Sequence, residues 1–318
     1  MHEDSSQENQ QEPIIPRESR PATERHGFPG WLMGFGWSIS SFVLFQVIAS
    51  IFAIIILLVL GRVTFDTFSP NALYDNLDVM FISNSLGQIL FLGLGTWLIV
   101  KLSARRSDRA TFLRLGKPKQ ASKNLLFAFL IVLVAQPLIM LMVWVNMQVP
   151  FSESYLAFEE TTIKLIENYL RSDHVLLFTL FHVAIVPAVC EELLFRGYVL
   201  RNFEKSMIPV VAIIVSGLLF GLYHIRLTQL IPLSVLGMLL AWMTIQTGSI
   251  WPAVVAHFAN NGFAVVLATF IPDLVFDESM QGTLPPVQYI IFSMFLTGVL
   301  LYLISVINKA PKPTDNYV

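Results

Sequence analysis

Eight long apolar segments constrain what this chain of 318 residues can fold into. They cover about residues 34–60, 79–100, 124–147, 174–198, 207–224, 228–247, 250–270 and 287–307, and each is close to the roughly 20 residues that a helix needs to cross a bilayer. The chain is 55% hydrophobic and 13% charged, whereas a soluble domain has about a quarter charged residues. Since backbone groups in lipid must bond within the segment, the sequence predicts an all-α polytopic membrane helical bundle of about eight transmembrane helices.

A single membrane domain with two polar tails is expected. Residues 1–27 are rich in Glu, Gln and Ser and have too little apolar surface to fold alone, which predicts a disordered polar tail. Residues 28–310 form the membrane domain, and residues 311–318 form a C-terminal tail. The stretch 151–173 has apolar residues at helical spacing but too many charges to span, so we expect an amphipathic helix at the interface.

Lysine and arginine residues are unevenly distributed among the loops. The connection 101–123 holds eight of them, whereas the loops on the other side hold only Arg62, Lys164, Arg171 and Arg226. The positive-inside rule places the basic loop in the cytoplasm, and with an even number of spans both termini are cytoplasmic as well. No basic stripe with interleaved aromatic residues is present, so a nucleic-acid partner is not expected.

Two adjacent glutamates and an arginine interrupt the fourth apolar segment. Glu191, Glu192 and Arg196 are the only charged residues within 178–200. An ionisable group at membrane depth is costly unless it is paired or faces a wet cavity, so it is a functional-site hypothesis by default. Glu192 and Arg196 are four residues apart and can form an ion pair on one helix face. Glu191 points about 100° away from Glu192 and is free to face the bundle. Snorkelling of both glutamates to interfacial water is the alternative.

A proline lies one turn before the glutamates. Pro187 has no N–H to donate to the carbonyl of Val183, so the helix should bend there. A bend opens space for water beside Glu191.

Two later segments each contribute a histidine. Phe220 and His224 are four residues apart, and His257 and Asn261 repeat the spacing on the seventh segment. A lone histidine on an apolar helix face is usually a hydrogen-bonded structural residue. Two histidines, an asparagine and two carboxylates in one bundle must all find partners away from bulk water. We expect them to face each other and a shared water.

This set of groups allows two kinds of hydrolysis. A carboxylate and a histidine can hold and deprotonate a water, and a histidine with an asparagine can donate to a developing oxyanion. Two histidines and a carboxylate could instead ligate a divalent metal such as zinc, although no H-E-x-x-H motif is present. The residues therefore do not decide whether the site binds a metal cofactor. The one cysteine, Cys190, excludes an internal disulfide and is expected to pack as a small apolar residue.

A different class of function also uses charged groups inside a membrane. A transporter or proton-coupled carrier could use Glu191, Glu192 and His224 as a relay. That interpretation predicts paired halves with interrupted helices in matching positions, and no internal repeat is visible in the sequence. A non-catalytic immunity or scaffold protein is a third class, which a missing motif residue would favour.

The three motifs EExxxR, FxxxH and HxxxN, in this order, resemble the CPBP family of intramembrane proteases. That family comprises the type II CAAX prenyl endopeptidases, or Ras-converting enzymes, and bacterial relatives linked to bacteriocin processing, self-immunity and abortive infection. The resemblance covers about residues 174–270 and is carried by seven residues: Glu191, Glu192, Arg196, Phe220, His224, His257 and Asn261. It implies an intramembrane endopeptidase that acts on a membrane-associated protein or peptide, in a bacterial plasma membrane.

The resemblance also implies a role for each motif residue. Glu191 is the general base that activates water, and His224 helps to position that water. His257 and Asn261 stabilise the oxyanion, while Glu192 is a further member of the site and Arg196 and Phe220 support it. Members of the family are described both as metalloproteases and as metal-independent glutamate proteases, and the residues permit either.

Overall fold

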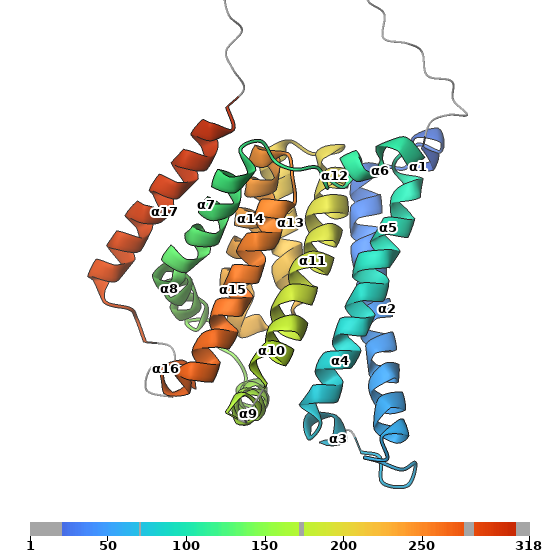
Figure 1. Ribbon diagram of the computed structural model, residues 1–318, viewed down its shortest axis with the longest axis vertical. Coiled ribbons are helices and arrows are strands. Elements are labelled where there is room, and N and C mark those ends of the chain that lie inside the picture. The colour runs from blue at the N-terminus through green and yellow to red at the C-terminus, as the bar shows by residue number, and fades with distance from the viewer. Residues whose placement is uncertain (1–20, 70, 172–174, 277–282, 310–318) are drawn as a thin grey trace, which may run out of the picture.

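The computed structural model describes residues 21–69, 71–171, 175–276 and 283–309, and these form a bundle of helices with no strand (Figure 1). The longer helices are α2 (Gly30–Val59), α4 (Leu77–Gly87), α7 (Ala121–Val134), α8 (Gln136–Asn146), α9 (Glu153–Leu170), α13 (Pro209–Tyr223), α14 (Leu230–Thr247), α15 (Trp251–Phe270) and α17 (Val287–Ile307). Short helices are α1 (Ala22–Arg25), α3 (Asn71–Tyr74), α5 (Thr96–Ile99), α6 (Arg109–Phe112), α10 (Leu176–Thr179), α11 (Val186–Glu192), α12 (Leu200–Glu204) and α16 (Pro272–Phe276). The predicted all-α polytopic bundle is confirmed.

The predicted number of spans needs correction. Within the described ranges, six helices are long and apolar enough to cross a membrane: Gly30–Val59, Leu77–Leu102, Leu176–Glu204, Leu227–Thr247, Trp251–Phe270 and Val287–Ile307. The expected span 124–147 is instead two helices, α7 and α8, bent by 48°, and counting this pair as one span gives seven. Pro137 explains the break, because it removes a backbone donor and its ring clashes with the carbonyl of Leu133. The expected span 207–224 is α13, whose 15 residues reach only about 22 Å.

The fourth segment is the centre of the fold. Residues Leu176–Glu204 form one continuous helix in which α10, α11 and α12 are joined by two wider, π-helical stretches, Leu180–Ile185 and Leu193–Val199. The side chains of Phe195, Tyr198 and Phe203 are fully buried here and join a core shared with α2 and α13. Such wide turns are rare and occur often at functional sites. They flank Glu191 and Glu192 on both sides.

The most lipid-exposed helix lies at the edge of the bundle. Only 17% of the apolar window of α17 is buried inside the protein, against 50% for the helix that contains α14. Figure 1 places α17 at one side of the bundle and α2 with α4 and α5 at the other. The site residues on α11, α13, α14 and α15 therefore lie between them.

One end of the bundle collects most of the basic loops, and we call it the basic end. Arg114 pairs with Glu204 at 2.9 Å, and the Ser249 hydroxyl donates to the Gly116 carbonyl at 2.6 Å. The loop 101–120 thus meets the end of α12 and the turn between α14 and α15. Both described ends of the chain, α1 and the end of α17, lie at the basic end (Figure 1). The short α13 leaves the basic end and α14 returns to it, so α13 adds an eighth passage to the seven spans counted above.

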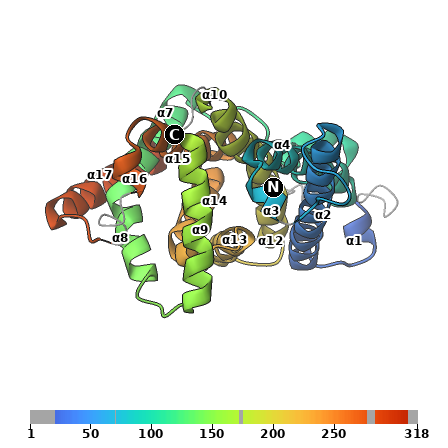
Figure 2. The same ribbon diagram turned by 90° about the horizontal axis from the view of Figure 1, so that it is seen from below.

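The expected amphipathic segment forms α9 at the opposite end. In Figure 1 it is seen along its axis, and in Figure 2 it is seen lengthwise across the bundle. It therefore lies across the other helices, as an interfacial helix does. Of the two expected tails, residues 1–20 and 310–318 lie outside the described residues, while the one-turn helix α1 falls within the expected N-terminal tail.

Candidate active site

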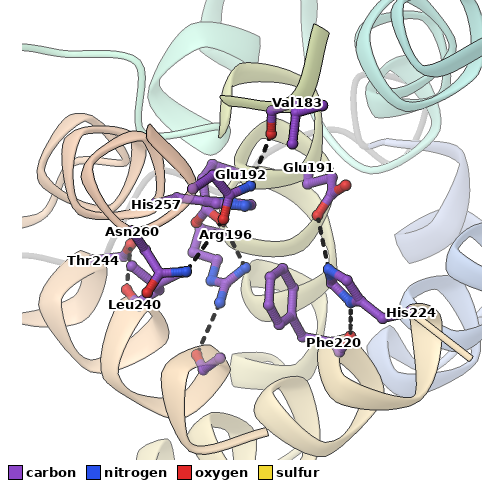
Figure 3. Close-up of polar contacts among 12 residues, drawn as sticks. Val183, Glu191, Glu192, Arg196, Phe220, His224, Leu240, Thr244, His257 and Asn260 are labelled. Atoms are coloured by element: carbon purple, nitrogen blue, oxygen red, sulfur yellow. Dashed lines mark hydrogen bonds and ion pairs between the residues drawn. The ribbon is translucent and has the colours of Figure 1, made fainter. Parts of the chain in front are cut away.

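The motif residues that Figure 3 labels lie close together, and Asn261 joins them through its bond to the carbonyl of Val183. Glu191 and Glu192 are neighbours on α11 and are 7% and 0% exposed. Because successive residues on a helix differ by about 100° in direction, the two carboxylates enter different surroundings. They form two distinct clusters, one around Glu192 and one around Glu191.

Glu192 is the centre of a fully buried polar cluster. Its Oε1 accepts from Nη1 of Arg196 at 3.0 Å and from Nδ1 of His257 at 2.9 Å. Arg196 also donates from Nη2 to the carbonyl of Gly237 at 2.9 Å. Its guanidinium carbon lies 4.5 Å from the ring centroid of Phe220, within the range of a cation–π interaction. The ion pair expected from the spacing of Glu192 and Arg196 is present, and it commits this glutamate to structural partners.

The carbonyl of Gly237, which accepts from Arg196, lies where α13 and α14 approach each other closely. A Cβ added to Gly237 of α14 would lie 2.9 Å from both the Cα and the carbonyl oxygen of Gly217 on α13. Only a residue without a side chain fits at that distance. A backbone carbonyl leaves no mark in a sequence pattern, so the motif analysis missed the contribution of Gly237.

Glu191 faces His224 instead. His224 lies at the C-terminal end of α13, and its Nδ1 is 2.8 Å from the carbonyl of Phe220. Its Nε2 lies 3.8 Å from Oε2 of Glu191, which is beyond hydrogen-bond distance. That carboxylate oxygen is buried and has no hydrogen-bond partner among the described residues. A buried polar atom without a partner is costly, and Oε2 of Glu192 and Nε of Arg196 are without a partner in the same way. What distinguishes Oε2 of Glu191 is the ring of His224, which lies 3.8 Å away and leaves room for a bridging molecule.

Phe220 lies between the two clusters. Its ring centroid is 4.8 Å from that of His224 and 5.7 Å from that of His257, and the residue is fully buried. The ring of Phe220 therefore lies beside that of His224, as the four-residue spacing allows, with the two ring planes tilted by 59°. The same ring also contacts the opposite cluster and keeps the two histidines apart.

Asn261 satisfies a backbone group that Pro187 leaves free. Its Nδ2 donates to the carbonyl of Val183 at 3.0 Å, the carbonyl that Pro187 cannot bond in the usual helical pattern. Its Oδ1 accepts from Nδ2 of Asn260 at 3.2 Å. The structure thus joins α15 to the fourth segment just before α11. Asn260 was not singled out from the sequence, although its position beside Asn261 was a usable signal.

Two other reactive side chains lie apart from these clusters. Cys190 is buried and close to Gly93, where an added Cβ would be 3.4 Å from its Sγ. Nδ1 of His182 lies 2.7 Å from the hydroxyl oxygen of Ser85 and forms a hydrogen bond with it. Both have ordinary packing or hydrogen-bonding surroundings.

A divalent metal does not fit the donor set as it is arranged. Among the residues that the structure describes, no group of three His, Cys, Asp or Glu side chains is placed to hold a metal ion. The donors occur as two separate pairs, and Oε1 of Glu192 is already bonded to both Arg196 and His257. A catalytic zinc site needs three protein ligands, so we derive no step through a metal.

Comparison with known proteins shows what this region is similar to. Residues 173–263 match the family model described as "Type II CAAX prenyl endopeptidase Rce1-like", and this range contains every motif residue. The match confirms the resemblance drawn from the three motifs. The proteins of that family are proteases, and the apolar helices of this chain are those of an integral membrane protein.

Two Bacillus subtilis proteins are each similar to part of this chain. "Uncharacterized protein YyaK" is 27% identical over 248 residues, which cover 75% of each chain. "Putative membrane peptidase YdiL" is 27% identical over 84 residues, which cover 26% of this chain and 34% of YdiL. No solved structure matches this chain.

Proposed function

We propose that this Rce1-like chain is an intramembrane endopeptidase that hydrolyses a peptide bond in a membrane-associated protein or peptide. Glu191 is the general base in this proposal. The observation that carries it is the pair formed by the unbonded Oε2 of Glu191 and Nε2 of His224, 3.8 Å apart in the bundle. Glu192 is bonded to Arg196 and His257, so the two glutamates have different roles.

The hydrogen bonds of His224 support a water between it and Glu191. A backbone carbonyl only accepts, so the contact with Phe220 places a proton on Nδ1. In the neutral ring Nε2 is then an acceptor, and an ionised Glu191 is an acceptor as well. Two acceptors 3.8 Å apart do not bond each other, but a water can donate one hydrogen to each. Its oxygen lone pairs are then directed toward a third group, the scissile carbonyl.

The reaction follows general acid–base chemistry. The water oxygen attacks the carbonyl carbon while its proton passes to Glu191, and the carbonyl becomes an oxyanion. The peptide C–N bond then breaks, and Glu191 returns the proton to the leaving amine. His224 holds the water throughout.

His257 and Asn261 are the proposed oxyanion donors. The bond between Nδ1 of His257 and Glu192 fixes the orientation of the ring and leaves Nε2 for the substrate. Asn261 uses one amide hydrogen on Val183 and has a second one to donate. Each donor of this kind stabilises the transition state by about 3–4 kcal/mol.

We propose that the basic end faces the cytoplasm of a bacterial cell, with both termini on that side. The partition of lysine and arginine between the two ends of the bundle supports this orientation, and both named relatives are bacterial. The site then lies within the plasma membrane, where the substrate is membrane-associated.

The experiment compares membrane proteomes of cells that carry the wild type, Glu191→Gln or Cys190→Ala. We expect a peptide that is processed by the wild type and by Cys190→Ala but not by Glu191→Gln. Processing that continues in Glu191→Gln contradicts the proposal. Purified enzyme then decides the metal question, since activity that survives chelation supports the glutamate mechanism. Loss on chelation with recovery on added zinc would replace it with a metal mechanism.

A further inference from the structure

The helix α9 has a polar contact face toward the loop that follows His224. It begins at Glu153 with the side chain of Ser152 accepting from the amide of Tyr155 at 3.3 Å. Leu156 and Phe158 are 37% and 56% exposed, which gives α9 an apolar surface outside the bundle. Since α9 lies across the bundle end (Figure 2), this surface suits a membrane interface. Its other side carries a partly buried acid, 12% exposed, that the proposed reaction does not use.

That acid is Glu159, and it gathers three polar groups. Its Oε1 accepts from the hydroxyl of Tyr155 at 2.9 Å and lies 3.6 Å from Nε of Arg226. Its Oε2 accepts from the hydroxyl of Thr228. The hydroxyl of Tyr155 in turn accepts from the amide of Leu227 at 2.9 Å. Burial and the bond to Glu159 raise the pKa of Tyr155, so the hydroxyl keeps its proton. Residues 226–228 are thus held one after another by α9.

The held segment begins two residues after His224, the ring proposed to position the water. Between them lies Ile225, with φ of +53°. This left-handed conformation is a genuine outlier for a β-branched residue, and such a backbone persists only when its surroundings fix it. Glu159 and Tyr155 fix this backbone by holding residues 226–228 from α9.

The other side of the same loop is held by α8. Nδ2 of Asn146 donates to the carbonyl of Leu227 at 2.8 Å, and its Oδ1 accepts from the amide of Ile231 at 2.8 Å. Asn146 thus anchors the loop at Leu227 and Ile231 independently of Glu159. This second anchor should keep a Glu159 variant folded.

We propose that Glu159 is a positioning residue for His224. By holding residues 226–228, it maintains the turn at Ile225 and thereby the distance between the ring of His224 and Glu191. This rests on the proposed function, in which His224 and Glu191 share the attacking water. The arrangement makes the catalytic geometry depend on how α9 lies at the membrane interface.

The test compares Glu159→Ala and Glu159→Gln with the matched control Glu160→Ala in nanodiscs. Glu160 is the next residue on α9, its side chain is 60% exposed, and its carboxylate pairs with Lys164. The first readout is backbone hydrogen exchange over residues 225–231. We expect faster exchange in Glu159→Ala and unchanged exchange in Glu160→Ala.

The second readout is cleavage of an internally quenched peptide with a prenylated C-terminus. Displacing a catalytic group by about 1 Å costs on the order of 10²-fold in rate, so Glu159→Ala should lose roughly 10- to 100-fold in kcat with an unchanged KM. The pH profile of kcat should change shape, whereas a mere loss of folded enzyme lowers the rate equally at every pH. Glu159→Gln keeps an acceptor oxygen and should recover part of the rate.

Two results would overturn the role of Glu159. One is exchange in Glu159→Ala that matches Glu160→Ala. The other is faster exchange with an unchanged kcat and pH profile. Retained cleavage in Glu191→Gln would instead overturn the proposed function. If the wild type leaves the peptide intact, the exchange comparison alone decides whether Glu159 holds the loop.

Discussion

Replacing Glu192 by alanine should destabilise the folded protein strongly. The substitution removes the acceptor of Arg196 at 3.0 Å and of His257 at 2.9 Å, at a place where the arginine is 0% exposed. Arg196 keeps the carbonyl of Gly237 and the face of Phe220, but no anion in direct contact. Breaking a buried pair in this way costs about 3–5 kcal/mol. With roughly 2–4 °C of Tm per kcal/mol, the expected loss is about 6–20 °C.

The assay is thermal unfolding of purified protein in detergent, followed by size-exclusion chromatography. The double variant Glu192→Ala/Arg196→Met removes both charges, and replacing a buried pair by apolar residues is often neutral or stabilising. It should therefore melt above Glu192→Ala. The matched control is Glu160→Ala, which breaks an exposed pair worth about 0–1 kcal/mol. A Tm of Glu192→Ala within about 2 °C of the control, or a double variant no more stable than the single one, would refute the reasoning.

Three further outcomes follow from the structure. Gly237→Ala should lower the free energy of unfolding by about 1–3 kcal/mol, because the added Cβ would lie 2.9 Å from backbone atoms of α13. Gly298→Ala, whose Cβ would meet nothing within 4 Å, should melt like the wild type. Equal melting of the two variants would contradict this. Fusions after Gly116 should report a cytoplasmic location and fusions after Phe65 the opposite side, and the same location for both would contradict a membrane span at Leu77–Leu102. His257→Ala should lower kcat about 10²–10³-fold with little change in KM, and a rise in KM alone would argue for a substrate-binding role.

The helices could be predicted from the sequence because the length of an apolar segment is a local property. Even the break at Pro137 had a visible signal, since proline removes a donor wherever it lies in a helix. The shortness of α13 was harder to predict, because its apolar residues continue without a break to His224, next to the turn at Ile225. The length of α13 decides how deep His224 lies in the bundle.

The partners of the site residues depend on how separate helices are rotated. The spacing of Glu192 and Arg196 predicted their ion pair, and Pro187 predicted an unbonded carbonyl at Val183. Nothing local indicated that Asn261, 78 residues away, would bond that carbonyl. Likewise the sequence predicted that both histidines and both carboxylates share one water, whereas the structure pairs His224 with Glu191 and His257 with Glu192.

One rate measurement tests whether the two glutamates have different roles. Single-turnover cleavage by Glu191→Gln, compared with the wild type on the same substrate, should fall by about 10²–10⁴-fold, the usual contribution of a general base. Thermal unfolding should be unchanged, because Oε2 of Glu191 has no hydrogen-bond partner among the described residues. A folded Glu191→Gln enzyme that cleaves within about tenfold of the wild-type rate would contradict the assignment of Glu191 as the base.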